Sequence, residues 1–84
     1  MAKVVKLSEK PTSQTIASMQ ELGKHIKYQR TKLGLTRENT ASICGINHQT
    51  LANIENGNDL CSAGNLFYVA KMLGIKLNVK IEDE

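Results

Sequence analysis

Residues 35–55 of this 84-residue chain read LTRENTASICGINHQTLANIE, and this stretch decides the fold. It contains two short helical patterns joined by a turn at residues 44–46. Thr36 and Asn47 precede the two patterns, and each offers a side-chain oxygen to the free backbone N–H groups of a helix start. Gly45 stands where the chain must leave the first helix with a positive φ, a conformation in which only glycine is unpenalised.

Each short helix is expected to have an inner and a free side. The residues expected to face inward are Ala41 and Ile43 in the first helix and Leu51 and Ile54 in the second. The polar residues His48, Gln49 and Asn53 then fall on the free face of the second helix. Two capped helices joined by a short glycine turn form a helix-turn-helix, whose second helix can enter the major groove of DNA. The pattern therefore predicts a module that reads DNA.

Helical patterns also flank this motif. Ser18 and Glu21 form a capping box, and the helix that follows is expected to end at Gly34. Its apolar positions at helical spacing are Leu22, Ile26 and Leu33. Ser62 can cap a last helix, which Gly74 stops. The inward stripe of that helix consists of Leu66, Val69, Ala70 and Leu73. The chain is thus expected to be mainly α.

After Gly74 the apolar residues alternate with polar ones, which is the pattern of a β-strand. The alternating apolar residues are Ile75, Leu77, Val79 and Ile81. One amphipathic strand cannot bury its apolar face alone, so we expect it to pair with the same strand of a second subunit across a two-fold axis. Pairing with residues 3–7 of the same chain is the alternative, and both can coexist in one sheet. We therefore divide the chain into an N-terminal arm (1–17), a helix-turn-helix domain (18–74) and a dimerising strand with an acidic tail (75–84).

The charge is positive apart from the C-terminus. The formal net charge is +3, and because Glu82, Asp83 and Glu84 contribute −3, residues 1–81 carry +6. A positive field favours binding to phosphates through counterion release. No apolar run reaches the roughly 20 residues that span a bilayer, and the first residues lack the apolar core of a signal peptide. We expect a cytoplasmic protein without membrane contact, whose acidic tail either improves solubility or contacts a basic partner.

Few residues suggest catalysis. Cys44 and Cys61 lack metal-ligand spacing, and we expect reduced thiols rather than a disulfide. The two histidines and the scattered carboxylates form no catalytic or metal constellation. His25 and Cys44 form the only base–nucleophile pair worth naming, and His25 is better explained as a solvated helix residue. We expect no enzyme activity, no metal and no cofactor.

Several segments together resemble the Cro/cI family of helix-turn-helix proteins, also called Xre-type. They are LGLT at 33–36, Ala41, GI at 45–46, TL at 50–51, IENG at 54–57 and AKMLG at 70–74. The resemblance implies a lambda-repressor-like bundle of four to five helices, here with a C-terminal β-strand. It also implies a homodimeric repressor that binds a pseudo-palindromic operator in double-stranded DNA. The terminal strand makes the chain similar to the HipB-like antitoxins, small dimers that repress their own operon and hold a kinase-like toxin.

The resemblance assigns roles to individual positions. His48, Gln49 and Asn53 match the base-reading positions, and a glutamine amide suits the N6 and N7 atoms of adenine. The positions that match contacts to the DNA backbone are Arg37, Asn47, Thr50 and Asn56. The alternative for Asn47 is that it acts only as a helix cap. The alternative for His48 is that it is an ordinary exposed helix residue. Arg30 and Glu55 match an internal ion pair that orients the second helix of the motif.

The chain departs from the family at three places. Asn39 replaces the usual Glu or Gln, and Thr40 replaces a large apolar residue, which predicts altered packing. The loop after Gly57 often carries Lys or Arg in the family but has Asn58 and Asp59 here, which predicts weaker phosphate binding there. The rival hypothesis is an interaction module that keeps the fold and has lost DNA reading. The polar free face of residues 47–53 favours DNA binding.

Overall fold

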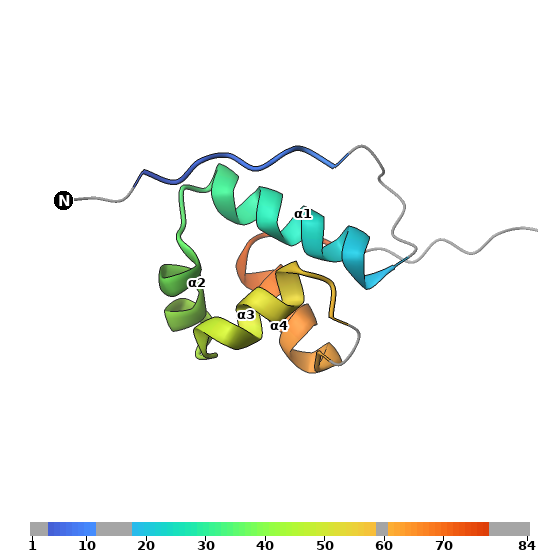
Figure 1. Cartoon of the computed structure of the whole chain (residues 1–84). Helices are drawn as coiled ribbons and strands as arrows, with labels where there is room; N and C mark the ends of the chain where they lie inside the picture. The colour runs from blue at the N-terminus through green and yellow to red at the C-terminus, as the bar shows by residue number, and fades with distance from the viewer. Residues whose placement is uncertain (1–3, 12–17, 59–60, 78–84) are drawn as a thin grey trace, which may run out of the picture.

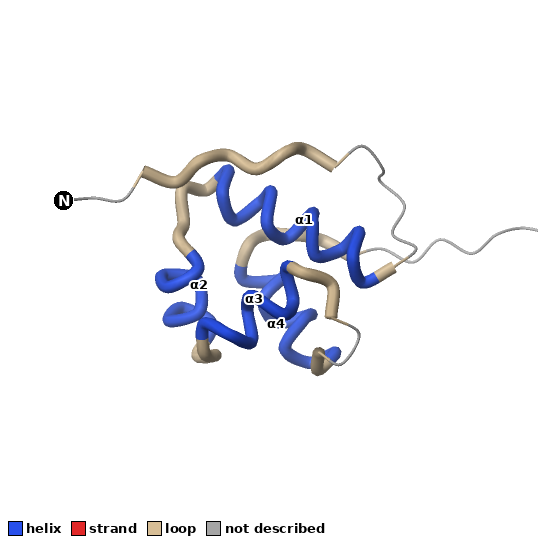
Figure 2. Tube along the Cα trace, in the orientation of Figure 1, coloured by secondary structure: helices blue, strands red, loops and turns tan. Residues whose placement is uncertain are grey.

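The computed structural model describes residues 4–11, 18–58 and 61–77, and this part of the chain forms four helices and no strand (Figures 1 and 2). The helices are α1 (Met19–Lys32), α2 (Arg37–Cys44), α3 (His48–Glu55) and α4 (Ala63–Met72). The predicted mainly α helix-turn-helix fold is therefore confirmed. None of these helices is long and apolar enough to cross a membrane.

The C-terminal strand is not present in the described part of the chain. Ile75 and Leu77 continue from α4 without strand structure, and Val79 and Ile81 lie outside the described residues. Residues 4–7, the alternative partner, form no strand either. A lone strand leaves its backbone groups unpaired, and the structure contains one chain.

All four helices begin at the predicted caps. The side chains of Ser18, Thr36, Asn47 and Ser62 each accept a hydrogen bond from the backbone N–H three residues later, at 3.2, 3.0, 2.7 and 3.4 Å. The turn between α2 and α3 also follows the prediction: Gly45 has φ 69°. The N–H of Ile46 reaches back to the carbonyl of Ala41, at 3.0 Å, so the end of α2 is closed by a backbone bond.

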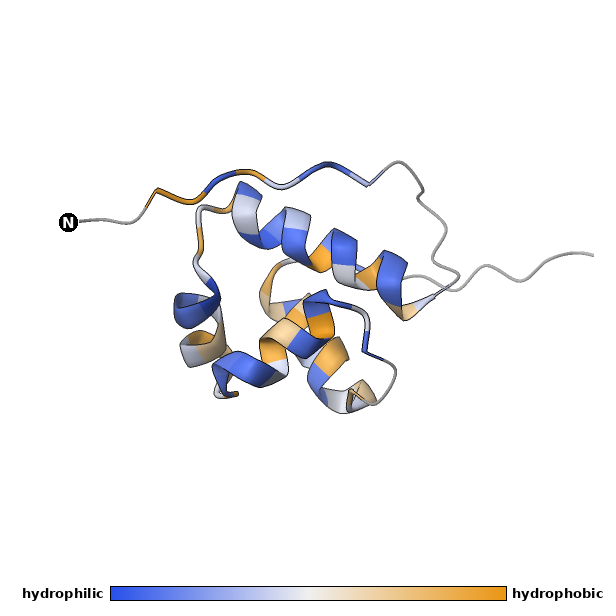
Figure 3. Ribbon diagram, viewed as in Figure 1, coloured by the Kyte–Doolittle hydropathy of each residue, from blue (hydrophilic) through white to orange (hydrophobic). Residues whose placement is uncertain are grey.

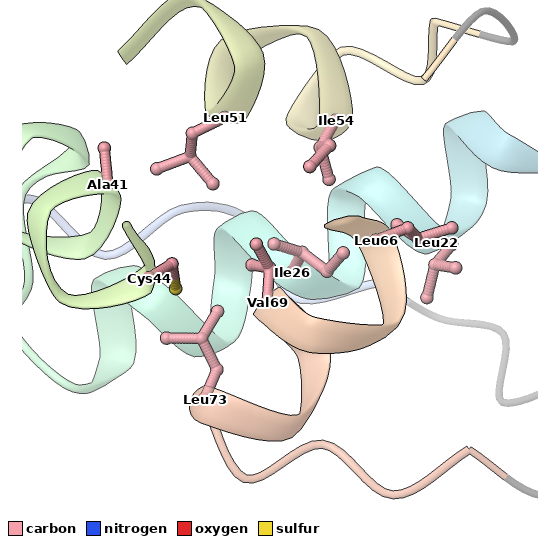
Figure 4. Packing of buried hydrophobic residues seen from close by; sticks show 9 residues of the cluster. All are labelled: Leu22, Ile26, Ala41, Cys44, Leu51, Ile54, Leu66, Val69 and Leu73. Atoms are coloured by element: carbon pink, nitrogen blue, oxygen red, sulfur yellow. The ribbon is translucent and has the colours of Figure 1, made fainter. Parts of the chain in front are cut away.

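Side chains from all four helices meet in one core (Figure 4). Its buried members are Leu22, Ile26, Ala41, Cys44, Leu51, Ile54, Leu66, Val69 and Leu73. The predicted stripe of α4 and the inward positions of α3 are thus confirmed. Figure 3 shows apolar and polar positions alternating along the helix ribbons, as expected for helices with one apolar side. Burying one such Leu, Ile or Val contributes about 1.5–3 kcal/mol, so the core holds α3 firmly against α1.

Two apolar residues expected on inner sides are exposed. Ile43 is 54% exposed and Leu33 is 52% exposed. An α-helix turns by about 100° per residue, so Ala41 and Ile43, two residues apart, cannot share one side, and Thr40 is buried beside Ala41 instead. Leu33 is the C-terminal cap of α1 and follows its last helical residue, so the helical spacing no longer predicts which way its side chain points. Within the described part of the chain the buried hydroxyl of Thr40 has no hydrogen-bond partner, and leaving such a group unpaired costs free energy.

The described part of the N-terminal arm runs along α1 on the side away from α3 (Figure 1). The backbone N–H of Ser8 donates to the hydroxyl of Thr31 at 3.0 Å, and this hydroxyl bonds to Ser8 Oγ at 3.3 Å. The arm therefore leaves the outward face of α3 uncovered.

Candidate nucleic-acid interface

The outward face of α3 carries the three side chains predicted to read bases. His48 and Gln49 are exposed and Asn53 is half-buried. Gln49 and Asn53 are four residues apart and so lie on one side of the helix. The Nε2 group of Gln49 donates to Oδ1 of Asn53 at 3.0 Å. The structure thus brings two carboxamides together at the surface, where their remaining donors and acceptors can meet a base edge.

The residues predicted to contact the DNA backbone surround this face. Asn47, which precedes α3, caps the helix and is exposed, while Thr50 is half-buried and Asn56 is exposed. The cap role of Asn47 is therefore observed, and it occupies only the Oδ1 atom in the bond to the Thr50 N–H.

Arg30 and Glu55 form the ion pair that the resemblance implied. Arg30 Nε lies 2.5 Å from Glu55 Oε2, and Nη2 donates to Oε1 at 3.1 Å. A third donor of the guanidinium, Nη1, reaches the carbonyl of Leu35 at 2.7 Å. The side chains are 7% and 0% exposed, so α1, the connection between α1 and α2, and the end of α3 meet at one buried charge cluster.

Arg37 belongs to the same cluster, which the sequence did not indicate. Its Nε donates to Glu55 Oε1 at 3.1 Å, and its side chain is 31% exposed. No local spacing links residues 37 and 55, because only the packing of α2 on α3 brings them together. A guanidinium has five N–H donors, so the bond through Nε is compatible with a further contact to a phosphate.

Gly23 is a second structural residue that the sequence did not reveal. A Cβ built at this position would lie 2.5 Å from the backbone oxygen of Glu55 and 2.6 Å from that of Ile54. Such distances are far inside van der Waals contact, so only glycine lets α1 approach the end of α3 this closely. The position of α3 is thus fixed by close backbone packing as well as by the charge cluster.

The cysteines are both free thiols. Cys44 is buried in the core, and burial raises the pKa of its thiol. Cys61 is half-buried. Within residues 4–11, 18–58 and 61–77, no group of three or more His, Cys, Asp or Glu side chains could hold a metal ion.

A family model matches the sequence, and several solved structures match the fold. The helix-turn-helix family model, of the Cro/cI type, matches residues 26–80. A HipB chain solved as a complex with an O2 20-mer is 25% identical; the match covers 86% of this chain and all of that one, with a TM-score of 0.76. A chain of the HipA–HipB–O2–O3 complex is also 25% identical, over 84% of this chain and all of that one, with a TM-score of 0.76.

The restriction-modification controller protein C.AhdI from Aeromonas hydrophila is a further match. It is 26% identical over 69% of this chain and 88% of its own, with a TM-score of 0.61. No curated protein matches the chain.

Proposed function

Because the chain belongs to the Cro/cI-type helix-turn-helix family, we propose that it is a sequence-specific DNA-binding repressor that acts as a homodimer on a pseudo-palindromic operator. The observation that carries this proposal is the pair of carboxamides on the outward face of α3, where the exposed Gln49 is hydrogen-bonded to the half-buried Asn53. Such groups suit the N6 and N7 atoms of adenine in the major groove. Repression follows from occupying promoter DNA and needs no chemistry on it.

The same geometry supports the roles of the neighbouring residues. Base reading is assigned to His48, Gln49 and Asn53, and backbone contacts to Arg37, Asn47, Thr50 and Asn56. Arg30 and Glu55 act from inside the fold, because their buried bonds tie α3 to α1. Loss of a backbone contact should weaken binding to all sequences, whereas loss of a base contact should weaken binding to the operator alone.

Dimerisation is assigned to Ile75, Leu77, Val79 and Ile81. Two recognition helices roughly 34 Å apart read successive major grooves on one side of DNA, so a dimer reads twice the sequence of a monomer. The outer side of α4 adds support, because Phe67, Tyr68 and Met72 are exposed there. Exposed aromatic and methionine side chains are enriched at protein interfaces.

The proposal also includes a protein partner. One of the similar structures contains HipA together with HipB. By this likeness, we infer that the chain is the antitoxin of a toxin–antitoxin operon, which represses that operon and binds a kinase-like toxin. Co-purification of the chain with the product of a neighbouring gene tests this extension separately from DNA binding.

The test of the main proposal is binding of the purified protein to the DNA upstream of its own gene, at 50 and 200 mM salt and with excess competitor DNA. Saturable binding that survives competitor is expected. Binding that competitor abolishes points to electrostatic attraction without base reading. No binding at either salt concentration favours the alternative function, a helix-turn-helix-fold interaction module that has lost DNA reading.

A further inference from the structure

A hydrogen bond between distant residues ties the end of α4 to α1. The side-chain Nε2 of Gln29, near the end of α1, donates to the backbone carbonyl of Leu73 at 3.0 Å, and the two residues are 44 positions apart in sequence. Leu73 is the C-terminal cap of α4 and is buried. Residues 75–81, to which dimerisation is assigned above, follow almost at once and are called the dimerising segment below. None of the roles proposed so far uses Gln29.

Local bonds fix the chain as it leaves α4. The N–H of Gly74 donates to the carbonyl of Lys71 at 3.1 Å, and the N–H of Ile75 donates to that of Ala70 at 2.9 Å. Gly74 has φ 79°, so a glycine in the left-handed conformation turns the chain out of the helix. Ile75 packs against the core, whereas Leu77 is 40% exposed. The start of the dimerising segment therefore leaves the domain in a direction that the end of α4 sets.

The same turn of α1 also holds α3, the proposed recognition helix. Arg30, the residue after Gln29, forms the buried ion pair with Glu55 at the end of α3. Two adjacent side chains of α1 thus hold the exit of the dimerising segment and the helix that carries the base-reading residues. The bond from Gln29 allows little movement, because a contact of about 3.6 Å is no longer a hydrogen bond.

A small change in this direction is large at the DNA. When two recognition helices are roughly 34 Å apart, each lies about 17 Å from the two-fold axis. A tilt of about 10° between one domain and that axis then moves its recognition helix by about 3 Å. The rise of one base pair is about 3.4 Å. A tilt of this size therefore changes the half-site spacing that the dimer fits by about one base pair.

We propose that Gln29 is a positioning residue that sets the half-site spacing of the operator, because its bond to Leu73 fixes the direction of the dimerising segment relative to α3. This inference rests on the proposed dimeric repressor and names a residue that decides which operators it accepts. Gln29 acts through the end of α4 and does not contact the DNA in this role.

Two variants remove the donor and keep a side chain of similar size. Gln29→Leu has no polar group, and Gln29→Glu, ionised at neutral pH, only accepts hydrogen bonds. Gln20→Leu is the matched control, because Gln20 is exposed and lies in the first turn of the same helix. The probes are labelled duplexes that carry the footprinted operator from the upstream DNA, either unchanged or with one base pair inserted or removed between the half-sites. Fluorescence anisotropy gives the affinity for each duplex, at a temperature where circular dichroism shows all variants folded.

The measured quantity is the spacing penalty, which is the affinity for the unchanged operator divided by that for an altered duplex. Each ratio compares two DNAs with the same protein, so a general effect of net charge on affinity cancels. One inserted base pair turns a half-site by about 35° around the DNA, so we expect a penalty of roughly tenfold or more in wild type and in Gln20→Leu. A neutral hydrogen bond changes an equilibrium by roughly two- to tenfold, and we expect the penalty to fall by such a factor in both Gln29 variants.

Three results separate a positioning role from the alternatives. If Gln29 only stabilised the fold, its variants would lower the melting temperature and keep the spacing penalty of wild type. That result would overturn the inference and leave the dimeric repressor standing. If wild type binds the upstream DNA no better than competitor, or shows no spacing penalty, the proposed dimer on a two-half-site operator fails and the inference fails with it.

Discussion

Replacing Arg30 with methionine tests the buried charge cluster most directly. The substitution keeps much of the side-chain volume but removes three hydrogen bonds, two to Glu55 and one to the carbonyl of Leu35. Among the described residues, Glu55, whose side chain is 0% exposed, then keeps only the bond from Arg37 at 3.1 Å. Arg30→Met thus leaves a buried carboxylate with one partly exposed partner.

Removing one partner of a buried ion pair costs about 3–5 kcal/mol. Because Arg37 remains, we expect the lower end, about 3 kcal/mol. A chain of this length has a total stability of roughly 4–13 kcal/mol. The loss corresponds to a fall in melting temperature of about 12–24 °C, at 4–8 °C for each kcal/mol in a domain of this size.

Arg37→Met is the matched control, because it removes one bond to the same carboxylate and leaves Arg30 in place. The Arg37 side chain is 31% exposed, and ion pairs open to solvent contribute only about 0–1 kcal/mol. Urea unfolding followed by circular dichroism at one protein concentration gives both free energies. Equal losses, or a loss below ~1 kcal/mol for Arg30→Met, would refute the claim that this pair anchors α3.

In DNA binding, we expect Arg37→Met to have the larger effect on the salt dependence, whereas Arg30→Met has the larger effect on folding stability. At a temperature where both are folded, Arg37→Met should reduce the salt slope by about one unit if Arg37 meets a phosphate. Arg30→Met should leave the slope unchanged, because Arg30 is buried.

Four further outcomes are expected. Gly23→Ala should destabilise the fold by more than about 2 kcal/mol, since the added methyl group would overlap the Glu55 backbone. Gly64→Ala is the control: there is space for the methyl group, so it should stabilise the fold by up to ~1 kcal/mol. Urea unfolding measures both changes in the free energy of unfolding. Burial raises the pKa of the Cys44 thiol above its ordinary 9.0, so the folded state keeps a proton that the unfolded state loses. The stability that this thiol contributes should therefore be complete below pH 9.0 and decline above it, and Cys44→Ala should remove this decline in unfolding curves measured against pH. Gln49→Ala should cost ~1–3 kcal/mol on the operator and little on random DNA; equal losses on both would remove Gln49 from the base-reading residues. Ending the chain at Leu77, which removes Val79 and Ile81, should weaken the dimer in ultracentrifugation; an unchanged dimer would contradict pairing through the strand.

The boundaries of the helices could be predicted because their signals are local. A cap or a stop needs only one side chain or one glycine at the right place, as at Asn47 and Gly45. The inward residues of α4 could be predicted for a related reason. Four apolar residues at helical spacing define one side of a helix, even when its neighbours are unknown.

The inner side of α2 could not be predicted in this way. This helix has eight residues and few apolar ones, so the side that faces the core depends on what α3 and α4 present to it. The threonine at position 40 is buried while the isoleucine at position 43 is exposed, which reverses the order that hydrophobicity alone suggests. The packing of the whole core therefore decides which side of α2 is buried.

The sequence by itself therefore determined where the helices begin and end, the helix-turn-helix order, and which polar residues stand on the outer face of α3. Only the tertiary structure decided the contacts between distant residues. Arg37 forms a hydrogen bond with Glu55, which lies 18 positions later in the sequence. Gly23 has no Cβ, and this lets the backbone of α1 pack closely against the end of α3. The physical reason is that caps and periodicity act within one or two turns of a helix, whereas a buried charge cluster and a close backbone approach exist only after the helices have packed.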